Sequence, residues 1–173
     1  EPVNRIMILG PCGSGKSTLA RRLGRMLDLP CYHLDQLMWS AGWVERDERD
    51  ERDWRPELDA IVQTPRWVID GNDASTMELR LARADQVVFL DFSTARCLWR
   101  VIRRIWSARG TTRPDMAPDC PERFDAGFLL YVATWHNRPR KRIERALAGH
   151  EDKVLYIRSP HELERWLASL SAR

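Results

Sequence analysis

The sequence predicts an α/β protein built on a parallel sheet, and three observations lead to this fold class. A short apolar run, Arg5–Leu9, leads directly into the glycine-rich stretch GPCGSGKST at residues 10–18. The segment after that stretch carries leucines at helical spacing, and strand-like runs then alternate with helical ones along the chain. With 173 residues, of which 43% are hydrophobic, the chain suits one domain with a proper core. We therefore expect a single domain over residues 1–173.

Five strands and six helical segments are expected from these patterns. The strands are Arg5–Leu9, Cys31–Leu34, Trp67–Ile69, Gln86–Leu90 and Lys153–Ile157. The helices are Lys16–Leu27, Glu48–Val62, Ser75–Leu81, Ser93–Trp106, a segment within Arg123–Ala148, and Pro160–Ser169. Ligands of such sheets bind beyond the carboxyl ends of the strands, so the residues that follow each strand are the candidates for function.

The glycine-rich stretch has the spacing of a phosphate-binding loop. The pattern Gly-x-x-x-x-Gly-Lys-Ser is met by Gly10, Gly15, Lys16 and Ser17. Its backbone N–H groups would cradle phosphate oxygens, Lys16 would add a positive charge, and the Ser17 hydroxyl would ligate Mg²⁺. We expect nucleotide binding at Gly10, Cys12, Gly13, Ser14, Gly15, Lys16, Ser17 and Thr18.

Carboxylates follow three of the predicted strands. Asp70 comes after the apolar residues WVI and is the candidate for the acid on the metal side. Asp35 lies where a second substrate would reach it and would accept a proton from an acceptor hydroxyl. Asp91 is better explained as a helix cap, and capping is the alternative for the other two as well.

Arginines are concentrated between the fourth and fifth predicted strands. In the helix Ser93–Trp106, an apolar stripe of Leu98, Trp99, Ile102, Ile105 and Trp106 is expected to face the core, with arginines on the other face. A loop and further arginines follow, so we expect an arginine-rich lid over residues 107–140. Its cations would neutralise charge on a transferred phosphoryl group, and the alternative is a solvated basic face that touches nucleic acid.

The segment between the second and third predicted strands carries Trp39 and Trp43, which bracket a glycine. These tryptophans either shape an acceptor pocket or pack a surface loop onto the sheet.

The composition of the chain bears on its partners and on its cellular compartment. The net charge of +3 does not by itself require a nucleic-acid partner, and four scattered cysteines argue against a zinc cluster or a disulfide framework. The scattered cysteines fit the reduced thiols of a cytosolic enzyme, and no apolar run reaches membrane-spanning length, so we expect a cytoplasmic enzyme.

Together these motifs resemble the adenylate-kinase-like branch of P-loop kinases. The shared features are GPCGSGKST, the IDG at 69–71, the FLD at 89–91, and the pair Arg100 and Arg104 at the start of a lid. More narrowly, the chain resembles the DNA topology modulation proteins. That resemblance rests on YHLD (32–35), GWV (42–44), WVIDGN (67–72), LRL (79–81), LWRVI (98–102) and the stretch TRPDM…CPE (112–122).

The resemblance implies a three-layer P-loop NTPase fold whose five-stranded parallel sheet has the order 2-3-1-4-5. It implies ATP and Mg²⁺ at the glycine-rich loop, with Arg100 near the adenine and Arg104 near the phosphates. Adenylate kinases carry IDGFPR where this chain has IDGNDA, so the arginine that would hold an acceptor phosphate is missing there. Arg80, a few residues on, is the expected substitute.

These inferences favour an ATP-dependent kinase with a small-molecule acceptor. A nucleotide is one candidate for that acceptor. Lys16 would hold the donor, Ser17 and Asp70 the Mg²⁺, and Asp35 the acceptor, while Arg80, Arg104 and Arg138 would stabilise the transferred group. The alternative is a nucleotide-gated, nucleic-acid-binding regulator. It is supported by the basic helix with Trp99 and Trp106, although the apolar stripe predicts that both are buried. Nucleotide hydrolysis without an acceptor is the third hypothesis.

Overall fold

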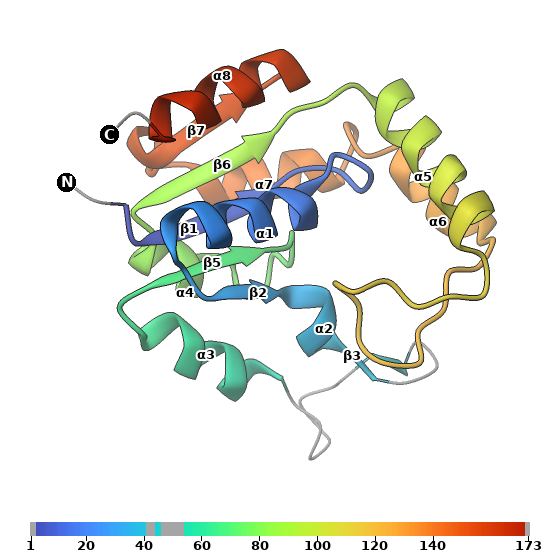
Figure 1. Cartoon of the computed structure of the whole chain (residues 1–173), viewed down its shortest axis with the longest axis horizontal. Helices are drawn as coiled ribbons and strands as arrows, with labels where there is room; N and C mark the ends of the chain where they lie inside the picture. Colours follow the sequence, from blue (N-terminus) through green and yellow to red (C-terminus); the bar gives the residue numbers. More distant parts are fainter. Residues whose placement is uncertain (1–2, 41–43, 46–53, 172–173) are drawn as a thin grey trace.

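The computed structural model describes residues 3–40, 44–45 and 54–171, and its main feature is a five-stranded parallel sheet (Figure 1). The strands are β1 (Arg5–Leu9), β2 (Cys31–His33), β5 (Trp67–Asp70), β6 (Gln86–Leu90) and β7 (Val154–Ile157). Their order across the sheet is β2-β5-β1-β6-β7. Numbered along the chain, this is the order 2-3-1-4-5, so the predicted fold class is confirmed.

Helices connect the strands and cover both faces of the sheet (Figure 1). The longer helices are α1 (Lys16–Leu27), α3 (Arg55–Gln63), α4 (Met77–Arg83), α5 (Thr94–Ala108), α6 (Ala126–Ala133), α7 (Pro139–Leu147) and α8 (Pro160–Ser171). Each main-sheet strand lies within one residue of its predicted bounds. The predicted helix Glu48–Val62 is observed as α3, and its predicted start at Glu48 lies outside the described residues, as does Trp43.

The sequence patterns did not predict several short elements that follow β2. They are the helix α2 (Leu34–Met38) and a two-stranded antiparallel sheet of β3 (Trp39–Ser40) and β4 (Val44–Glu45), while a 3-10 turn (Glu151–Lys153) precedes β7. Helix α2 begins directly where β2 ends, and it therefore carries Asp35 to the edge of the sheet where ligands bind. No described helix combines the length and apolarity needed to cross a bilayer.

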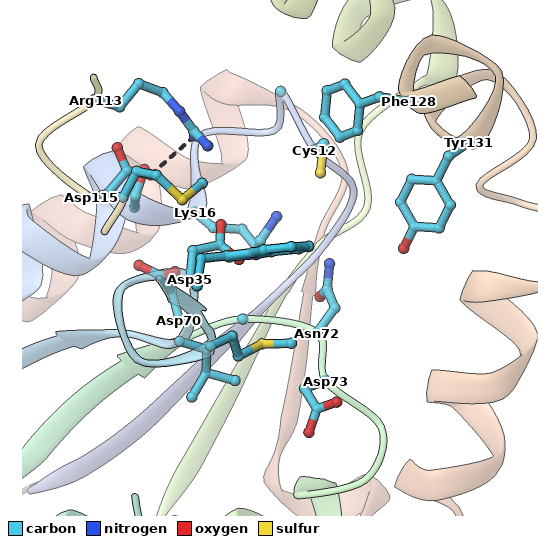
Figure 2. A pocket seen from close by; sticks show the side chains of 18 of the residues that line it. Cys12, Lys16, Asp35, Asp70, Asn72, Asp73, Arg113, Asp115, Phe128 and Tyr131 are labelled. Atoms are coloured by element: carbon cyan, nitrogen blue, oxygen red, sulfur yellow. Dashed lines mark hydrogen bonds and ion pairs between the residues drawn. The ribbon is translucent and has the colours of Figure 1, made fainter. Parts of the chain in front are cut away.

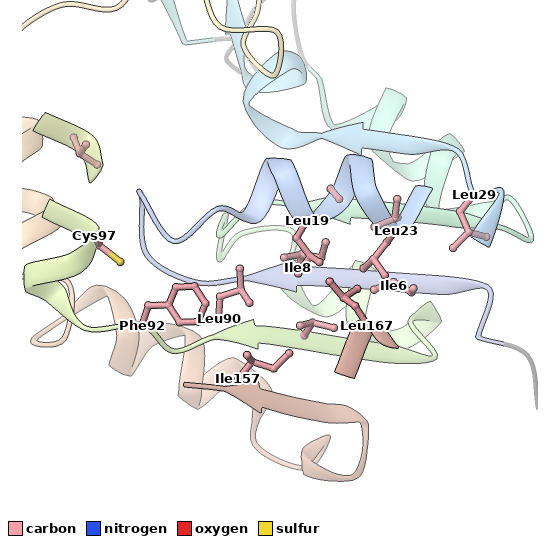
Figure 3. Packing of buried hydrophobic residues seen from close by; sticks show 14 of the residues in the cluster. Ile6, Ile8, Leu19, Leu23, Leu29, Leu90, Phe92, Cys97, Ile157 and Leu167 are labelled. Atoms are coloured by element: carbon pink, nitrogen blue, oxygen red, sulfur yellow. The ribbon is translucent and has the colours of Figure 1, made fainter. Parts of the chain in front are cut away.

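Alternating residues of the central strand β1 feed two separate apolar cores. Ile6 and Ile8 pack with side chains of α1, α5 and α8, and Figure 3 shows this cluster. Met7 and Leu9 point to the opposite face, where they pack with side chains of α3, α4 and α7. Because every β1 side chain from Ile6 to Leu9 is almost fully buried, the strand reads as a continuous apolar run, as central parallel strands do.

Helix α5 buries only Ile105 of the apolar stripe that the sequence predicted, while Leu98 packs partly against the core. Its buried residues are Cys97, Val101 and Ile105, whereas Trp99 and Trp106 are 65% and 84% exposed. The reason is a close approach to the glycine-rich loop. A Cβ atom on Gly13 would lie 2.4 Å from the carbonyl oxygen of Cys97 and 3.0 Å from Cγ2 of Val101. At that separation small side chains fit against the loop and an indole does not.

Candidate active site

A pocket of about 1000 Å³ lies at the carboxyl ends of the strands, where the fold class predicts a ligand site. Figure 2 shows Lys16, Asp35 and Asp70 close together in the pocket, and Phe128 and Tyr131 project from the other side. The volume lies at the upper end of the range that small-molecule sites occupy. The pocket is therefore large enough for a nucleotide and a second small molecule.

The glycine-rich loop and the start of α1 form one wall of this pocket. Cys12, Gly13, Gly15, Lys16, Ser17 and Thr18 line it. Two further predicted loop residues do not line the pocket: Gly10, and the buried Ser14, whose hydroxyl donates to the carbonyl of Pro11 at 2.6 Å.

No side chain caps the first turn of α1, and this turn contains no acidic residue. The first N–H groups of the helix therefore have no acceptor from a capping side chain, which is the arrangement that binds phosphate at a helix N-terminus. Lys16 adds a positive charge there, and its Nζ lies 3.1 Å from the carbonyl oxygen of Pro11. The wall therefore fits an anionic phosphate chain.

Asp70 ends β5 and forms a buried ion pair with His33, which ends the neighbouring strand β2. Nδ1 of His33 is hydrogen-bonded to Oδ2 of Asp70, and both side chains are 7% exposed. Burial lowers the pKa of His33, but hydrogen bonds to Asp70 and Cys31 outweigh this effect and raise the pKa to about 10. The imidazole is therefore a cation at neutral pH, and sequence reasoning assigned no role to it.

Asp35 lies in the first turn of α2 and lines the pocket next to Lys16. Burial raises the pKa of its carboxyl group, while the positive charges of Lys16 and Arg113 partly offset this rise. A carboxylate with a raised pKa is a better proton acceptor than an ordinary aspartate. The site therefore contains a base next to a phosphate-binding loop.

Arg80 is not brought to the pocket, which corrects the expectation that it would hold an acceptor phosphate. Its side chain is fully buried, and the guanidinium donates to the carbonyls of Gly71 at 2.9 Å and Asp73 at 2.7 Å. Helix α4 begins at Met77, so Arg80 lies on the helix face beneath the loop that follows β5. It supports that loop and is absent from the pocket lining.

Asn72, between those two carbonyls, is a residue that sequence reasoning passed over. Its side-chain amide accepts from the N–H of Gly10 at 3.1 Å and donates to the carbonyl of Gly10 at 2.6 Å. The signal was present, because a polar residue follows Gly71 directly at a strand end. Asn72 lines the pocket and joins the loop after β5 to the glycine-rich loop.

The loop between α5 and α6, residues 109–125, covers the pocket and is called the lid below, whereas the lid predicted over residues 107–140 also takes in α6 and the start of α7. Glu122 is buried within it, and its Oε1 lies 2.9 Å from Nε of Arg104 and 2.6 Å from Nε of Arg113. Arg113 also pairs with the buried Asp115 at 3.1 Å. Arg104 is thus engaged by a carboxylate while it lines the pocket, and Arg100 lies beside it near the loop, with NH1 3.4 Å from the carbonyl oxygen of Ser14.

The lid is in contact with the segment that follows β2. The Nε2 of Gln36 donates to the carbonyl of Pro114 at 2.6 Å, and Trp39 packs against Met116, Ala117 and Cys120 of the lid. Trp39 also lines the pocket, as the first of its two predicted roles requires, but it packs against the lid and not against the sheet clusters. In this structure the lid is therefore closed over the pocket.

Arginines at the start of α7 line the pocket from the far side. Arg138, which was predicted to stabilise the transferred group, and Arg142 are four residues apart and so share a helix face. Among the described residues, no carboxylate pairs with either guanidinium.

Asp91, which was predicted to be a helix cap, pairs instead with Arg140 of α7 at 2.5 Å. The cap of α5 is Ser93, whose hydroxyl accepts from the N–H of Arg96.

The residues present fit a magnesium ion that is held mainly by phosphates and water. No group of three or more metal-binding side chains is gathered anywhere in the described part of the chain. Mg²⁺ in phosphoryl-transfer sites typically has one or two protein ligands and keeps several waters. The hydroxyl of Ser17 lines the pocket, and Asp70 has one carboxylate oxygen beyond its bond to His33. These two groups are the ones that would hold it.

Comparison with known proteins agrees with this architecture. A family model described as an AAA domain matches residues 6–125. A shikimate kinase structure from Bacteroides thetaiotaomicron is 18% identical, with a TM-score of 0.57, over 99% of this chain and 98% of that chain. A gluconokinase from Sinorhizobium meliloti is 17% identical, with a TM-score of 0.55, over 98% and 94%. A shikimate kinase from Aquifex aeolicus is 18% identical, with a TM-score of 0.54, over 96% and 95%. These similarities establish a shared fold, and no curated protein matches the sequence significantly.

Proposed function

We propose that this chain, which belongs to the AAA domain family whose model matches residues 6–125, is an ATP- and Mg²⁺-dependent kinase with a small anionic acceptor. The observation that carries the proposal is that Lys16 and Asp35 line one pocket beneath the lid. The first belongs to a phosphate-binding loop, and the second has the raised pKa of a base. The kinase structures that share the fold support the reaction type.

In the proposed reaction the acceptor hydroxyl oxygen attacks the γ-phosphorus of ATP. The bond between that phosphorus and the bridging oxygen of ADP breaks, and the hydroxyl proton passes to Asp35. Lys16 and the loop N–H groups hold the phosphates in line, and Arg104 balances the charge that spreads over the transferred group. Magnesium, when bound, neutralises charge on the β- and γ-oxygens. The closed lid excludes water, which would otherwise compete with the acceptor.

Arg138 and Arg142 support an anionic acceptor. Both line the pocket and lack a carboxylate partner among the described residues, so a carboxylate or phosphate of the acceptor would satisfy them. Since Arg80 is buried beneath the loop, these arginines replace it in the proposal as the groups that hold the acceptor. The narrower relationship to DNA topology modulation proteins stays a prediction.

The test is ADP release from Mg²⁺-ATP across a panel of acceptors: hydroxy acids, sugar acids, nucleoside monophosphates, neutral sugars and nucleosides. We expect a jump in rate with one anionic member of the panel and little with its neutral analogue. Lys16→Ala should abolish transfer while the protein still folds, with Lys141→Ala, an exposed residue away from the pocket, as its control.

A second pair of variants tests the acceptor side. Arg142→Gln should raise KM for the acceptor with little change in KM for ATP, whereas Arg145→Gln, exposed on the same helix outside the pocket, should change neither. A slow rate that no acceptor alters would contradict the kinase proposal and favour hydrolysis or a nucleotide switch. A neutral acceptor that works as well as an anionic one would contradict the role of Arg142.

A further inference from the structure

Helix α5 presents an exposed stripe in which arginines and tryptophans alternate. Arg96, Trp99, Arg103 and Trp106 are all exposed, at spacings of three and four residues that bring them to one side of the helix. The tryptophans are 65% and 84% exposed. Large exposed apolar side chains concentrate in this region, because five of the six that the described residues contain lie between residues 99 and 131.

The exposure is a property of the folded helix. Its opposite side is already filled, since Cys97, Val101 and Ile105 are buried in the core and lie against the glycine-rich loop. Figure 3 shows Cys97 directed into this packing. A rotation that buried Trp99 would drive an indole into the space that Gly13 leaves free. The tryptophans therefore stay at the surface for as long as α5 covers the loop.

The stripe carries positive charge without compensation. Helix α5 contains no acidic residue, and among the described residues no carboxylate pairs with Arg96 or Arg103. The guanidinium carbon of Arg96 lies 5.8 Å from the centre of the Phe92 ring. This cation–π contact supplies no negative charge, so the positive charge of Arg96 is not neutralised. The partner that complements this surface is therefore an anion, and a second copy of the same stripe would instead bring like charges together.

Two kinds of polyanion remain, and the helix distinguishes them. A helix that lies on an anionic membrane inserts a free apolar face beside a basic one. In α5 the apolar face is buried within the protein, and the exposed side mixes indoles with guanidinium groups along one line. That mixture matches a strand of phosphates with bases attached, because indoles stack on unpaired bases while arginines contact the phosphates.

We propose that the α5 stripe, defined as Arg96, Trp99, Arg103 and Trp106, binds single-stranded nucleic acid. The two tryptophans are separated by seven residues, or about 10.5 Å along the helix axis, so each would stack on a different base. Bases in a duplex are already stacked and paired, so a duplex would contact the arginines alone. This proposal does not rest on the kinase reaction, because none of the four side chains lines the pocket.

The test uses the intact protein and a fluorescently labelled oligo(dT), longer than the roughly 4–16 nucleotides that one binding module typically covers. Binding is followed by anisotropy at several salt concentrations. From the typical energy of base stacking, Trp99→Ala and Trp106→Ala should each weaken binding about 5- to 150-fold. Arg103→Gln should lower the slope of log K against log salt by about 0.7, the contribution of one phosphate contact on a single strand.

Matched controls lie on α1, where Arg25 and Met26 are exposed at the end of the helix. Arg25→Gln and Met26→Ala should leave the affinity for oligo(dT) unchanged. Because the tested side chains are exposed, folding should be unaltered, and unchanged ADP binding by each variant verifies this. Excess ADP should not displace the oligonucleotide; displacement would mean that the pocket binds it and would overturn the proposal.

Three further results would also overturn it: no binding of oligo(dT) at low salt, binding that the tryptophan variants leave unchanged, and equal affinity for a duplex of the same sequence. Vesicles of phosphatidylcholine with phosphatidylserine provide the membrane comparison. If they bind the protein with the same dependence on Trp99 and Trp106 while oligo(dT) does not, the stripe is a membrane-binding surface and the assignment to nucleic acid is wrong.

Discussion

The side-chain amide of Asn72 pairs with the backbone of Gly10 in both directions, at 3.1 Å and 2.6 Å. Gly10 follows β1 and Asn72 follows β5, so one side chain holds together the loops at two neighbouring strand ends. Arg80 fixes the carbonyls on either side of Asn72 from below. The position of the glycine-rich loop therefore depends on residues that lie outside that loop.

Asn72→Ala should weaken both stability and nucleotide binding while the fold is kept. Two hydrogen bonds are lost, each with a net contribution of about 0.5–1.5 kcal/mol, so we expect the free energy of unfolding to fall by roughly 1–3 kcal/mol. Part of the loss should appear as weaker binding of Mg²⁺-ADP, because the start of the loop is no longer held. Thermal unfolding with and without Mg²⁺-ADP measures both effects.

The control for this prediction is Asn137→Ala, an exposed asparagine outside the pocket, which should change neither quantity. Asn72→Asp adds a sharper comparison. It keeps an acceptor for the N–H of Gly10 but sets a carboxylate against the carbonyl of Gly10, so it should be at least as harmful as alanine. An unchanged affinity for Mg²⁺-ADP in both variants would show that the loop needs no such support.

The main sheet was predictable from sequence because each strand is an apolar run that ends at a polar residue or a glycine. Residues Arg5–Leu9 and Gln86–Leu90 match their predicted bounds. The phosphate-binding loop was predictable for a similar reason, since its spacing is local in the chain. Helix α2 was not, because five residues are too few to establish a helical period.

The faces of α4 and α5 could not be predicted, because they depend on partners distant in the chain. Both sides of α5 carry apolar residues, and the choice between them is made by the packing of Val101 against Gly13. Arg80 follows the strand end closely enough to suggest a ligand contact, yet the start of α4 turns it beneath the loop. The pairing of His33 with Asp70 likewise exists only once β2 and β5 are neighbours.

The ion pair between His33 and Asp70 should make stability depend on pH in a defined direction. Because the pKa of His33 is raised from 6.5 to about 10 in the folded protein, its stabilising effect is full below about pH 6.5. The effect should then decline as the pH rises and be lost above pH 10. Chemical denaturation of the wild type and of His33→Gln between about pH 6 and 10, which spans the two pKa values, measures this difference.

At neutral pH, His33→Gln should lower the free energy of unfolding by about 3–5 kcal/mol, because it leaves the buried carboxylate of Asp70 without its cation. The exposed His161→Gln is the matched control. The prediction fails if the difference between the wild type and His33→Gln does not shrink as the pH rises.

Asp35→Asn should separate catalysis from stability. If Asp35 accepts the proton, the variant should lose about 10²- to 10⁴-fold in kcat while Mg²⁺-ADP still binds. Because the pKa of Asp35 is raised by burial, its ionised form is less favourable in the folded protein than in the unfolded chain. The variant should therefore unfold at a higher temperature than the wild type at neutral pH.

The wild-type rate provides a second check on Asp35. Its acidic limb should fall at a pH above that of an ordinary aspartate, because the base must be ionised to accept a proton. Asp59→Asn, on the exposed side of α3, serves as the control. A variant that keeps its rate, or one that is destabilised while losing it, would argue against a base with a raised pKa at this position.

Glu122→Gln should uncouple ATP hydrolysis from transfer. Glu122 is buried in the lid, and one of its oxygens lies within 2.9 Å of Nε of both Arg104 and Arg113. Removing its charge leaves two neighbouring cations without their shared partner, so the lid should close less firmly and admit water. We expect the ratio of acceptor-independent hydrolysis to transfer to rise about tenfold, which corresponds to roughly 1.4 kcal/mol of lost discrimination.

The control is Glu144→Gln, which removes the charge of one of the two carboxylate partners of Arg140 and lies outside the pocket. Trypsin gives an independent measure of closure, since the lid arginines Arg109, Arg113 and Arg123 should be cut faster in Glu122→Gln and at the wild-type rate in Glu144→Gln. If cleavage accelerates while the ratio of hydrolysis to transfer stays constant, the lid does not exclude water. If neither changes, the ion pairs of Glu122 do not hold the lid closed.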